Sequence, residues 1–414
     1  MADFQRLERE LRSAVAGEVR FDEGARAVYA SDASNYRQVP IGVVLPRSTD
    51  DIVAAVALCR AHGAPLLARG GGTSQCGQGV NVAVVIDCSK YLHQVLGVDA
   101  QAGLARVEPG AACDALRDAA EQHGLTFAPD PATHSRCTLG GMIGNNSCGP
   151  HSLMAGKTVE NIERLEVLTY DGARFWCGAT APQNLQKIIF EGGRRGKIYS
   201  DLKAIADKYA ALVRSGFPKI KRRVSGYNLD QLLPENGFNL ARALVGSEGT
   251  CALTLQAEAR LVKSPRERVL VVLGFPDIFA AGDAVPRLLE SGPIACEGLD
   301  ERIIGGLRER RLALEEIALL PPGNGWLMLE FGGDSREEVL SRAKQLPGLL
   351  IEDRALMARL WSIRETGASA TALSLGGSGR DQLVGWEDAA VDPMRIGDYL
   401  REFRALIARF GYRT

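Results

Sequence analysis

The spacing of hydrophobic and polar residues in the first ninety positions predicts helices alternating with strands. Apolar residues recur at helical spacing over 3–16, which indicates an amphipathic helix. Short apolar runs at 41–45, 65–69 and 82–87 are typical of buried strands. Between the first two runs, Ser48 or Thr49 can cap a helix that ends near Gly63. This part therefore reads as a strand–helix–strand unit followed by a further strand.

The pattern from residue 104 to 262 also mixes both kinds of element. Asp171-Gly172 between two apolar runs is a strong hairpin signal. Helices are expected over 111–123 and 198–214. Strands are expected at 104–108, 162–170, 173–176, 242–245 and 253–262.

Beyond Pro265 the order of elements changes. Strands are expected at 268–274, 295–299, 326–331 and 349–351, and helices at 277–289, 335–344, 353–367 and 396–410. Helices that cover an antiparallel sheet make an α+β domain. The chain shows no internal repeat and no low-complexity linker. We therefore expect two domains, 1–262 and 263–414.

Composition narrows the class of protein. The 414 residues are 46% hydrophobic and 24% charged, as in ordinary globular proteins. The net charge of −1 gives no overall basic field for nucleic acid or an anionic membrane. No apolar run reaches the length of a membrane span, and the N-terminus has no signal-peptide core. We expect a cytoplasmic protein whose membrane contact, if any, is peripheral at the inner membrane.

The nine cysteines argue against a zinc or iron–sulfur centre in this chain. None of them forms a Cys-x-x-Cys pair, the spacing on which such sites usually rest. Most lie in apolar surroundings, as buried free thiols do in a reducing compartment. No metal ligand is therefore expected.

Three loops of small residues carry the chemistry. Loop one is Arg69-Gly-Gly-Gly-Thr-Ser-Gln-Cys-Gly-Gln-Gly79, loop two is Thr138-Leu-Gly-Gly-Met-Ile-Gly-Asn-Asn-Ser-Cys-Gly149, and loop three is Gly246-Ser-Glu-Gly-Thr250. Glycine lets backbone N–H groups approach a ligand, and successive N–H groups favour anions. The usual nicotinamide and ATP glycine spacings are absent. Loops one and two together indicate one long, phosphate-bearing ligand.

Simpler interpretations of these loops stay open from the residues alone. A glycine loop is often only a turn, and loop two could be stabilised by its own Asn side chains. Loop three could be any connection between two strands.

The loops, together with Pro46-Arg-Ser-Thr-Asp-Asp-Ile52 and Ser225-Gly-Tyr-Asn-Leu229, resemble the vanillyl-alcohol oxidase/p-cresol methylhydroxylase (PCMH) superfamily. The likeness covers nearly the whole chain. It is strongest to the branch of FAD-linked 2-hydroxy-acid dehydrogenases, which includes D-lactate and D-2-hydroxyglutarate dehydrogenases. The wording of loop two is most similar to large bacterial enzymes that fuse this flavin half to an iron–sulfur half.

The resemblance implies an α+β fold, with a PCMH-type FAD-binding domain of two α/β subdomains followed by a ferredoxin-like substrate (cap) domain. It implies FAD as the cofactor. Relatives that bind FAD covalently often carry a His in loop one, which has none here, so noncovalent FAD is expected. The implied FAD-binding residues are Pro46, Arg69, Gly70, Gly71, Gly72, Thr73, Ser74, Gly79, Pro129, Thr138, Gly141, Gly144, Asn145, Ser147, Gly149, Glu248, Gly249 and Leu253.

Two residues are implied at the substrate. Arg364, in Trp361-Ser-Ile-Arg-Glu365, matches a segment of the branch and would hold the substrate carboxylate by a bidentate ion pair. A helical Arg paired with Glu365 or another acid is the plainer interpretation. Asp388, in Trp386-Glu-Asp-Ala-Ala-Val-Asp-Pro393, would border the active site, although an exposed acidic turn explains it equally well.

One expected motif is missing. Relatives of this branch follow their last helix with a His-x-Gly-Asp-Gly strand that supplies a base or a metal ligand, and the sequence given stops at Thr414. All five histidines precede residue 152, and only His134 and His151 flank loop two. We therefore expect a fragment whose cap domain is incomplete, with any iron–sulfur cluster in an absent C-terminal half.

The resemblance implies oxidation of a D-2-hydroxy acid to the 2-oxo acid, by hydride transfer to flavin N5. Electrons would pass to an iron–sulfur partner or a quinone, and self-association stays open. Three alternatives remain, namely an alkyl-glycerone-phosphate synthase-like flavoenzyme, another oxidase of the superfamily, and a non-catalytic FAD-binding subunit. Arg380 or Arg395 is a candidate for a second cationic contact, which D-2-hydroxyglutarate would need.

Overall fold

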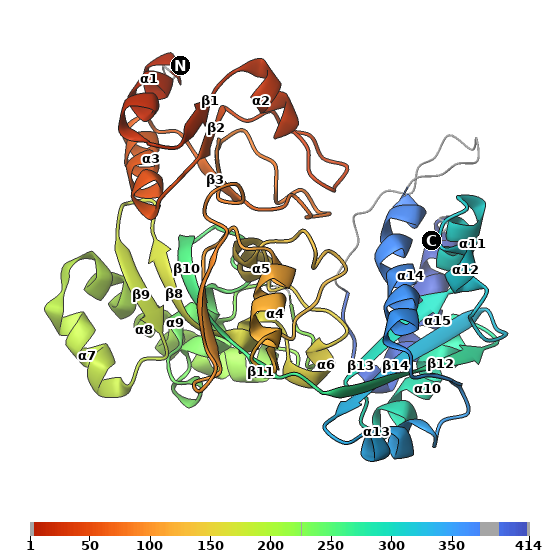
Figure 1. The fold of residues 1–414 in the computed structure, drawn as a ribbon. Coiled ribbons are helices and arrows are strands. Elements are labelled where there is room, and N and C mark those ends of the chain that lie inside the picture. Colours follow the sequence, from red (N-terminus) through yellow and green to blue (C-terminus); the bar gives the residue numbers. More distant parts are fainter. Residues whose placement is uncertain (1–3, 225, 373–388, 412–414) are drawn as a thin grey trace.

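The computed structural model describes residues 4–224, 226–372 and 389–411. The chain forms a small N-terminal α/β layer, a larger layer built on an antiparallel sheet, and a C-terminal α+β unit at the other end of the molecule (Figure 1). This is the mixed fold that the sequence predicts.

The N-terminal subdomain is a four-stranded sheet in the order β1-β2-β4-β3. Its strands are β1 (Glu18–Arg20), β2 (Gly42–Leu45), β3 (Leu66–Arg69) and β4 (Val84–Asp87), and its helices are α1 (Phe4–Ala14), α2 (Glu23–Val28) and α3 (Thr49–Ala61). β2 and β3 both pair parallel to β4. Leu7, Ile52 and Val84 are among the buried residues that join α1 and α3 to the sheet. Parallel strands direct both following loops toward one edge.

The second subdomain is a five-stranded antiparallel sheet in the order β5-β6-β10-β8-β9. Its strands are β5 (Val95–Asp99), β6 (Leu104–Val107), β8 (Ile162–Leu168), β9 (Arg174–Gly178) and β10 (Leu253–Arg260). Its helices are α4 (Cys113–Glu121), α5 (Leu139–Asn145), α6 (Ser152–Ala155), α7 (Pro182–Glu191), α8 (Gly193–Gly216) and α9 (Leu240–Leu244). Single turns of 3₁₀ helix lie at Thr158–Asn161, Leu229–Leu232 and Pro234–Asn236.

One predicted strand is wrong. The segment 242–245 lies mostly within α9, because Asn239 caps that helix by accepting a hydrogen bond from the Arg242 amide at 3.1 Å. Leu240 and Ala241 are buried in the core of the second subdomain. A short apolar run has no period of its own, so its length and flanking cap decide its structure.

The C-terminal unit is a four-stranded antiparallel sheet in the order β13-β14-β12-β15. Its strands are β12 (Glu267–Phe275), β13 (Ala295–Asp300), β14 (Gly325–Gly333) and β15 (Leu349–Ile351). Its helices are α10 (Ile278–Leu289), α11 (Glu301–Glu309), α12 (Leu314–Ile317), α13 (Arg336–Ala343), α14 (Arg354–Ala372) and α15 (Ile396–Arg409), with a 3₁₀ turn at Pro393–Arg395. With helices between β12 and β13 and between β14 and β15, this is the expected ferredoxin-like arrangement.

The link between the two halves is a short ladder. β11 (Val262–Lys263) pairs with β7 (Leu125–Thr126), and the chain then crosses to β12 (Figure 1). The buried hydrophobic residues form separate clusters on either side of this crossing. We therefore propose a division into two domains between residues 262 and 263. The C-terminal unit is called the cap domain below.

Candidate functional site

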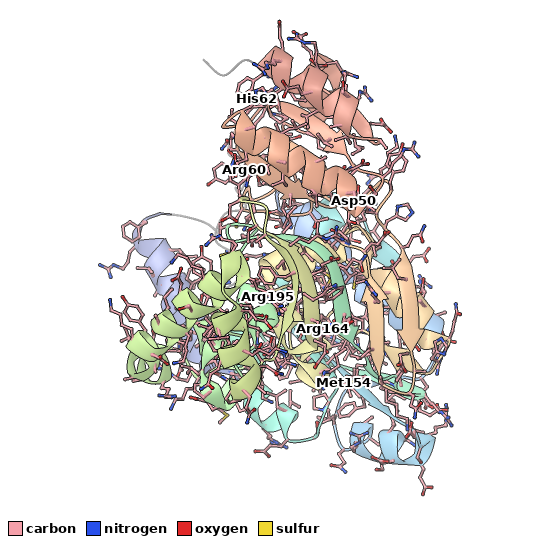
Figure 2. The ribbon with its side chains drawn as sticks, turned by 90° about the vertical axis from the view of Figure 1, so that its left-hand side faces the viewer. Asp50, Arg60, His62, Met154, Arg164 and Arg195 are labelled. Carbon is pink, nitrogen blue, oxygen red and sulfur yellow. The ribbon has the colours of Figure 1, made fainter. Side chains whose placement is uncertain are left out.

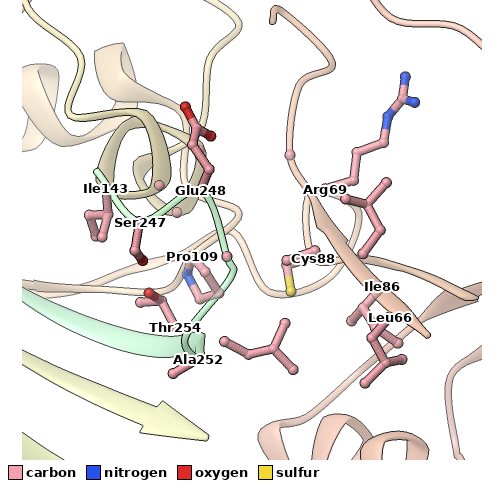
Figure 3. A pocket seen from close by; sticks show the side chains of 18 of the residues that line it. Leu66, Arg69, Ile86, Cys88, Pro109, Ile143, Ser247, Glu248, Ala252 and Thr254 are labelled. Atoms are coloured by element: carbon pink, nitrogen blue, oxygen red, sulfur yellow. The ribbon is translucent and has the colours of Figure 1, made fainter. Parts of the chain in front are cut away.

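A cavity of about 280 Å³ lies between the two sheets of the N-terminal half. Loops one, two and three all contribute to its lining. Figure 3 shows Ser247 and Thr254 on one wall, with Leu66 and Ile86 on the other. The walls thus combine apolar side chains with eight polar ones, as a site for a cofactor with both rings and phosphates needs.

Loop one leaves β3 and is held in shape by Arg69. The guanidinium of Arg69 donates hydrogen bonds to the carbonyl oxygens of Gly79 at 2.9 Å and Ser31 at 2.8 Å. Figure 3 shows this side chain directed away from the cavity. Gly72 has a φ of 65°, in the region that favours glycine. Arg69 therefore closes the loop, and its guanidinium is occupied by backbone oxygens.

Loops one and two are in direct contact. A Cβ atom on Gly70 would lie 2.0 Å from Thr138 Oγ1, and one on Gly71 would lie 2.3 Å from the Arg136 carbonyl oxygen. Neither position has room for any side chain. The two glycines thus allow the backbones to meet at the rim of the cavity.

Loop two contains a helix that the sequence does not predict. Thr138 caps α5 by accepting a hydrogen bond from the Gly141 amide at 3.3 Å. Asn146 ends it in the left-handed region, with a φ of 62°. Three glycines in seven residues disfavour a helix in isolation. Its neighbours therefore stabilise it.

Loop three supplies much of that support. The amide of Gly246 donates to the Ile143 carbonyl at 2.8 Å, and the amide of Glu248 donates to the Gly144 carbonyl at 2.9 Å. The Glu248 carboxylate also accepts from Asn145 Nδ2 at 3.1 Å. These bonds satisfy carbonyl groups that the end of a helix leaves without partners. Loops two and three thus form one wall of the cavity.

The structure brings eight of the eighteen predicted FAD-binding residues to the cavity lining. They are Arg69, Gly70, Thr138, Gly141, Gly144, Glu248, Gly249 and Leu253.

The other ten predicted residues lie outside that lining. Pro46 is buried where β2 turns toward α3, and Gly149 packs so tightly that a Cβ would lie 2.0 Å from the Asp130 carbonyl oxygen. The remaining eight belong to the outer parts of loops one and two or to the segment before loop two: Gly71, Gly72, Thr73, Ser74, Gly79, Pro129, Asn145 and Ser147. These positions remain proposals for contacts made by a ligand that extends beyond the cavity.

Sequence reasoning missed several lining residues. The polar ones include Gln78, Ser247, Thr250 and Thr254. Cys88 and Pro109 also line the cavity. Gln78, Ser247 and Thr250 stand inside quoted loops, so loop membership could have identified them. Cys88, Pro109 and Thr254 carry no such signal, because only the packing of the two sheets places them at the cavity.

A second cluster joins loop two to the cap domain. His151 is buried, and its ring contacts the Asp130 carboxylate at 2.6 Å through Nδ1 and the Glu330 carboxylate at 3.2 Å through Nε2. Glu330, on β14, also accepts from Arg268 at 3.2 Å and from the Trp361 indole at 3.0 Å. Charges from both domains therefore meet in one buried network.

The network holds His151 in its charged form. Burial opposes that form, but the charges and hydrogen bonds of Asp130 and Glu330 outweigh it and raise the His151 pKa to about 9. For Asp130 and Glu330, burial alone would raise the pKa, and His151 instead lowers it below the ordinary value. His151 is thus a fixed cation between two carboxylates.

His134 forms a parallel link to α14. Its Nδ1 lies 2.7 Å from the Asp114 carboxylate, and its Nε2 lies 3.2 Å from Glu365. Burial works against protonation, yet the hydrogen bonds to both acids raise the pKa of His134. Both histidines near loop two therefore bridge the domains.

Arg364 lies beside this link but does not line the cavity. Its Nε lies 2.6 Å from Glu297 on β13, so its acidic partner is Glu297, while Glu365 contacts His134. Asp388 lies outside the described residues.

Within 4–224, 226–372 and 389–411, no three His, Cys, Asp or Glu side chains are grouped as a metal site would need. No helix in the same ranges combines the length and apolar character needed to cross a membrane.

Two protein families match this chain. The family described as "FAD binding domain" matches residues 40–178, and the family described as "FAD linked oxidases, C-terminal domain" matches residues 264–414. The first match contains loops one and two, and the second spans the cap domain.

Curated relatives agree with these families. The chain is 28% identical to D-2-hydroxyglutarate dehydrogenase of Pseudomonas putida, over 98% of this chain and 42% of that protein. It is 27% identical to the protein of the same name from Escherichia coli, over 93% of this chain and 40% of that one. It is 26% identical to D-lactate dehydrogenase of Archaeoglobus fulgidus, over 95% of this chain and 74% of that protein. The chain thus spans about two fifths of the first two relatives.

A solved structure supports the fold. An alkyldihydroxyacetonephosphate synthase superposes with a TM-score of 0.61 at 17% identity, covering 89% of this chain and 68% of that one. At this identity the likeness concerns the fold alone.

Proposed function

Because this chain belongs to the PCMH superfamily of FAD-linked oxidases, we propose that it is the flavin-binding part of a dehydrogenase that oxidises a D-2-hydroxy acid to the 2-oxo acid. D-2-hydroxyglutarate and D-lactate are the candidate substrates, because relatives carry those names.

The observation that carries the proposal is the fit of the cavity to FAD. Gly144 and Gly249 line the cavity, and a Cβ atom on either would meet no protein atom closer than 3.8 Å, so a ligand can approach the backbone there. Leu66 and Ile86 offer an apolar wall for ring systems, while Ser247 and Thr250 offer hydroxyl groups. This combination suits a long ligand with both phosphates and aromatic rings.

When bound, FAD would supply the hydride acceptor for the oxidation. The chain's own residues bind and orient the two reactants. Loops one and two would hold the phosphates, and loop three would lie near the adenosine end. Because loop one lacks a His, we propose that the cofactor is held without a covalent bond.

We place the substrate carboxylate at Arg364. Its fork of N–H donors matches a carboxylate, and Glu297 already shows that a carboxylate reaches Nε at 2.6 Å. A substrate carboxylate would exchange with Glu297. Orienting the acid in this way makes the transfer effectively intramolecular, which is a large part of catalysis in such reactions.

Partners and location follow as proposals only. Electrons would leave to an iron–sulfur domain or a quinone, and Asp388 remains a proposed neighbour of the substrate. We propose a cytoplasmic protein whose membrane contact is peripheral.

The test is anaerobic mixing of the oxidised flavoprotein with D- and L-hydroxy acids. The protein should come from its native host, so that the natural polypeptide is used. The flavin absorbance should be bleached by a D-2-hydroxy acid and left unchanged by its L-enantiomer. Bound FAD that no D-acid bleaches would refute the proposed reaction, and it would favour a non-catalytic flavin subunit.

Arg364→Gln should lower kcat/KM for the D-acid by at least roughly 100-fold. Hydrogen bonds to a charged partner contribute about 1.5–3 kcal/mol each, and the change removes both arms of the fork. Steady-state kinetics measures the loss. Arg359→Gln is the matched control, because Arg359 lies on the same helix and pairs with exposed Glu315 and partly buried Glu316. Equal activity of the Arg364 variant and the control would remove Arg364 from the substrate site.

A further inference from the structure

The helical pair α7–α8 concentrates positive charge in a chain that is almost neutral overall. Residues 182–224 contain eleven Lys and Arg residues against three Asp and Glu residues, while the whole chain has a net charge of −1. The rest of the chain is therefore acidic. The pair lies on the side of the molecule away from the cap domain (Figure 1). Figure 2 looks onto this face, where Arg195 marks α8.

One line of exposed residues runs along the outer face of α8. Its members recur every three or four positions, so they share a single face of the helix. The line is Arg194, Lys197, Asp201, Ile205, Lys208 and Leu212. Along this helix of 24 residues, which is about 36 Å long at 1.5 Å per residue, charged residues occupy the first half of the line, and Lys208 lies between Ile205 and Leu212 in the second half. A helix with this surface can lie flat on a charged interface.

Two large apolar side chains of the helical pair are exposed to solvent. Phe190, at the end of α7, is 93% exposed, and Leu212 is 65% exposed. The opposite side of α8 is packed, with Tyr199 and Val213 buried. Helix α8 therefore buries its own apolar side, and the exposed apolar residues are additional to that packing.

Part of the charge is available to a partner. Carboxylates outside the segment pair with Arg194, Arg214 and Arg223. No carboxylate of the described residues pairs with Lys208, Lys219 or Lys221 in this way. Lys208 stacks on the ring of Tyr209 at 5.0 Å, and Lys219 and Lys221 are exposed in the connection after α8.

We propose that the α7–α8 face docks on an anionic lipid bilayer. Phe190 and Leu212 would enter the acyl boundary, while Lys208, Lys219 and Lys221 would contact lipid phosphates. A protein partner is less suited, because protein interfaces gather their apolar anchors in a central patch, and here Phe190 and Leu212 lie on different helices. The proposal assigns a surface to the peripheral membrane contact proposed above, and it does not depend on the proposed oxidation.

Co-sedimentation with vesicles tests the proposal. The whole protein should bind vesicles of equal parts phosphatidylglycerol and phosphatidylcholine, and should not bind phosphatidylcholine alone. The triple variant Lys208→Gln, Lys219→Gln and Lys221→Gln should bind roughly 100-fold more weakly, since each cation near an anionic surface contributes about fivefold. The double variant Phe190→Ser and Leu212→Ser should lose at least about tenfold, from lost apolar burial.

Matched controls separate this surface from general effects. Arg287→Gln, Lys344→Gln and Arg409→Gln remove the same charge from exposed sites of the cap domain, and Val28→Ser removes a 71% exposed apolar residue from α2. These controls should bind as the wild type does, and every variant should retain its flavin and its thermal midpoint.

Three results would overturn the proposal. They are absence of wild-type binding to the anionic vesicles, an equal loss in the controls, and unchanged binding of the Phe190/Leu212 variant together with equally tight binding to double-stranded DNA. The last result would indicate a polyelectrolyte surface. A failure here leaves the flavin-bleaching result unaffected, so the two proposals fail separately.

Discussion

Replacing His151 with alanine is expected to lower the free energy of unfolding by about 3–5 kcal/mol, the usual cost of removing one partner from a buried charge pair. Without the imidazolium, the carboxylates of Asp130 and Glu330 would remain buried within one network without the cation between them. Urea unfolding at pH 6 measures the change. Because Glu330 belongs to the cap domain, contact between the domains should weaken at the same time.

The loss should depend on pH in a defined direction. His151 has a pKa of about 9 when folded and an ordinary value of 6.5, so its stabilisation is complete below 6.5 and disappears as the pH rises through about 9. Asp130 and Glu330 have lowered pKa values, so their contribution is present at neutral pH and is lost in acid. The wild type and the variant should therefore differ most from about pH 5 to 6.5.

His123→Ala is the control for this prediction. His123 is exposed just beyond the end of α4, so its loss should change stability by less than about 0.5 kcal/mol. A His151 variant as stable as this control, or a difference that grows above pH 9, would contradict the role of the network.

Gly144→Leu is expected to weaken FAD binding roughly 10- to 100-fold, because overfilling a packed site costs about 1–3 kcal/mol. Gly144 lines the cavity, and a Cβ there would have only Glu248 within 4 Å, at 3.8 and 3.9 Å. The added side chain therefore fits the protein and occupies space that the cofactor needs. Titration of the apoprotein with FAD, followed by flavin fluorescence, measures the loss.

The matched change is Gly305→Leu. Gly305 is also inside a helix, and a Cβ there would meet nothing within 4 Å. Both variants should unfold within about 1 kcal/mol of the wild type, since neither creates a clash. Wild-type FAD affinity in the Gly144 variant would mean that the cofactor does not occupy this cavity.

Most strands of the sheets were predicted from the sequence, because apolar runs and turn residues identify them clearly. Apolar runs such as 82–87 and the Asp171-Gly172 hairpin define strands β4, β8 and β9. The short segment 242–245 failed, because its cap at Asn239 decides its conformation. Helix α5 was missed, because bonds from loop three stabilise a segment rich in glycine.

For the candidate site, local sequence motifs identified the loops, and long-range packing decided which other residues lie at the site. Gly70 and Gly144 were predicted and line the cavity. Arg69 was also predicted, but its guanidinium binds backbone oxygens of the surrounding loops. The contact between His151 and Glu330 joins residues 179 positions apart, and no local pattern announces such a pair. Arg364 likewise meets Glu297 only through the fold of the cap domain.

A crystal structure of this protein grown with FAD would show directly whether the cavity holds the cofactor. We expect cofactor density in the cavity, with the pyrophosphate where Gly70 meets Thr138 and the adenosine end near Gly249. Flavin that binds one-to-one in solution but lies outside this cavity in the crystal would show that the cavity is not the FAD site.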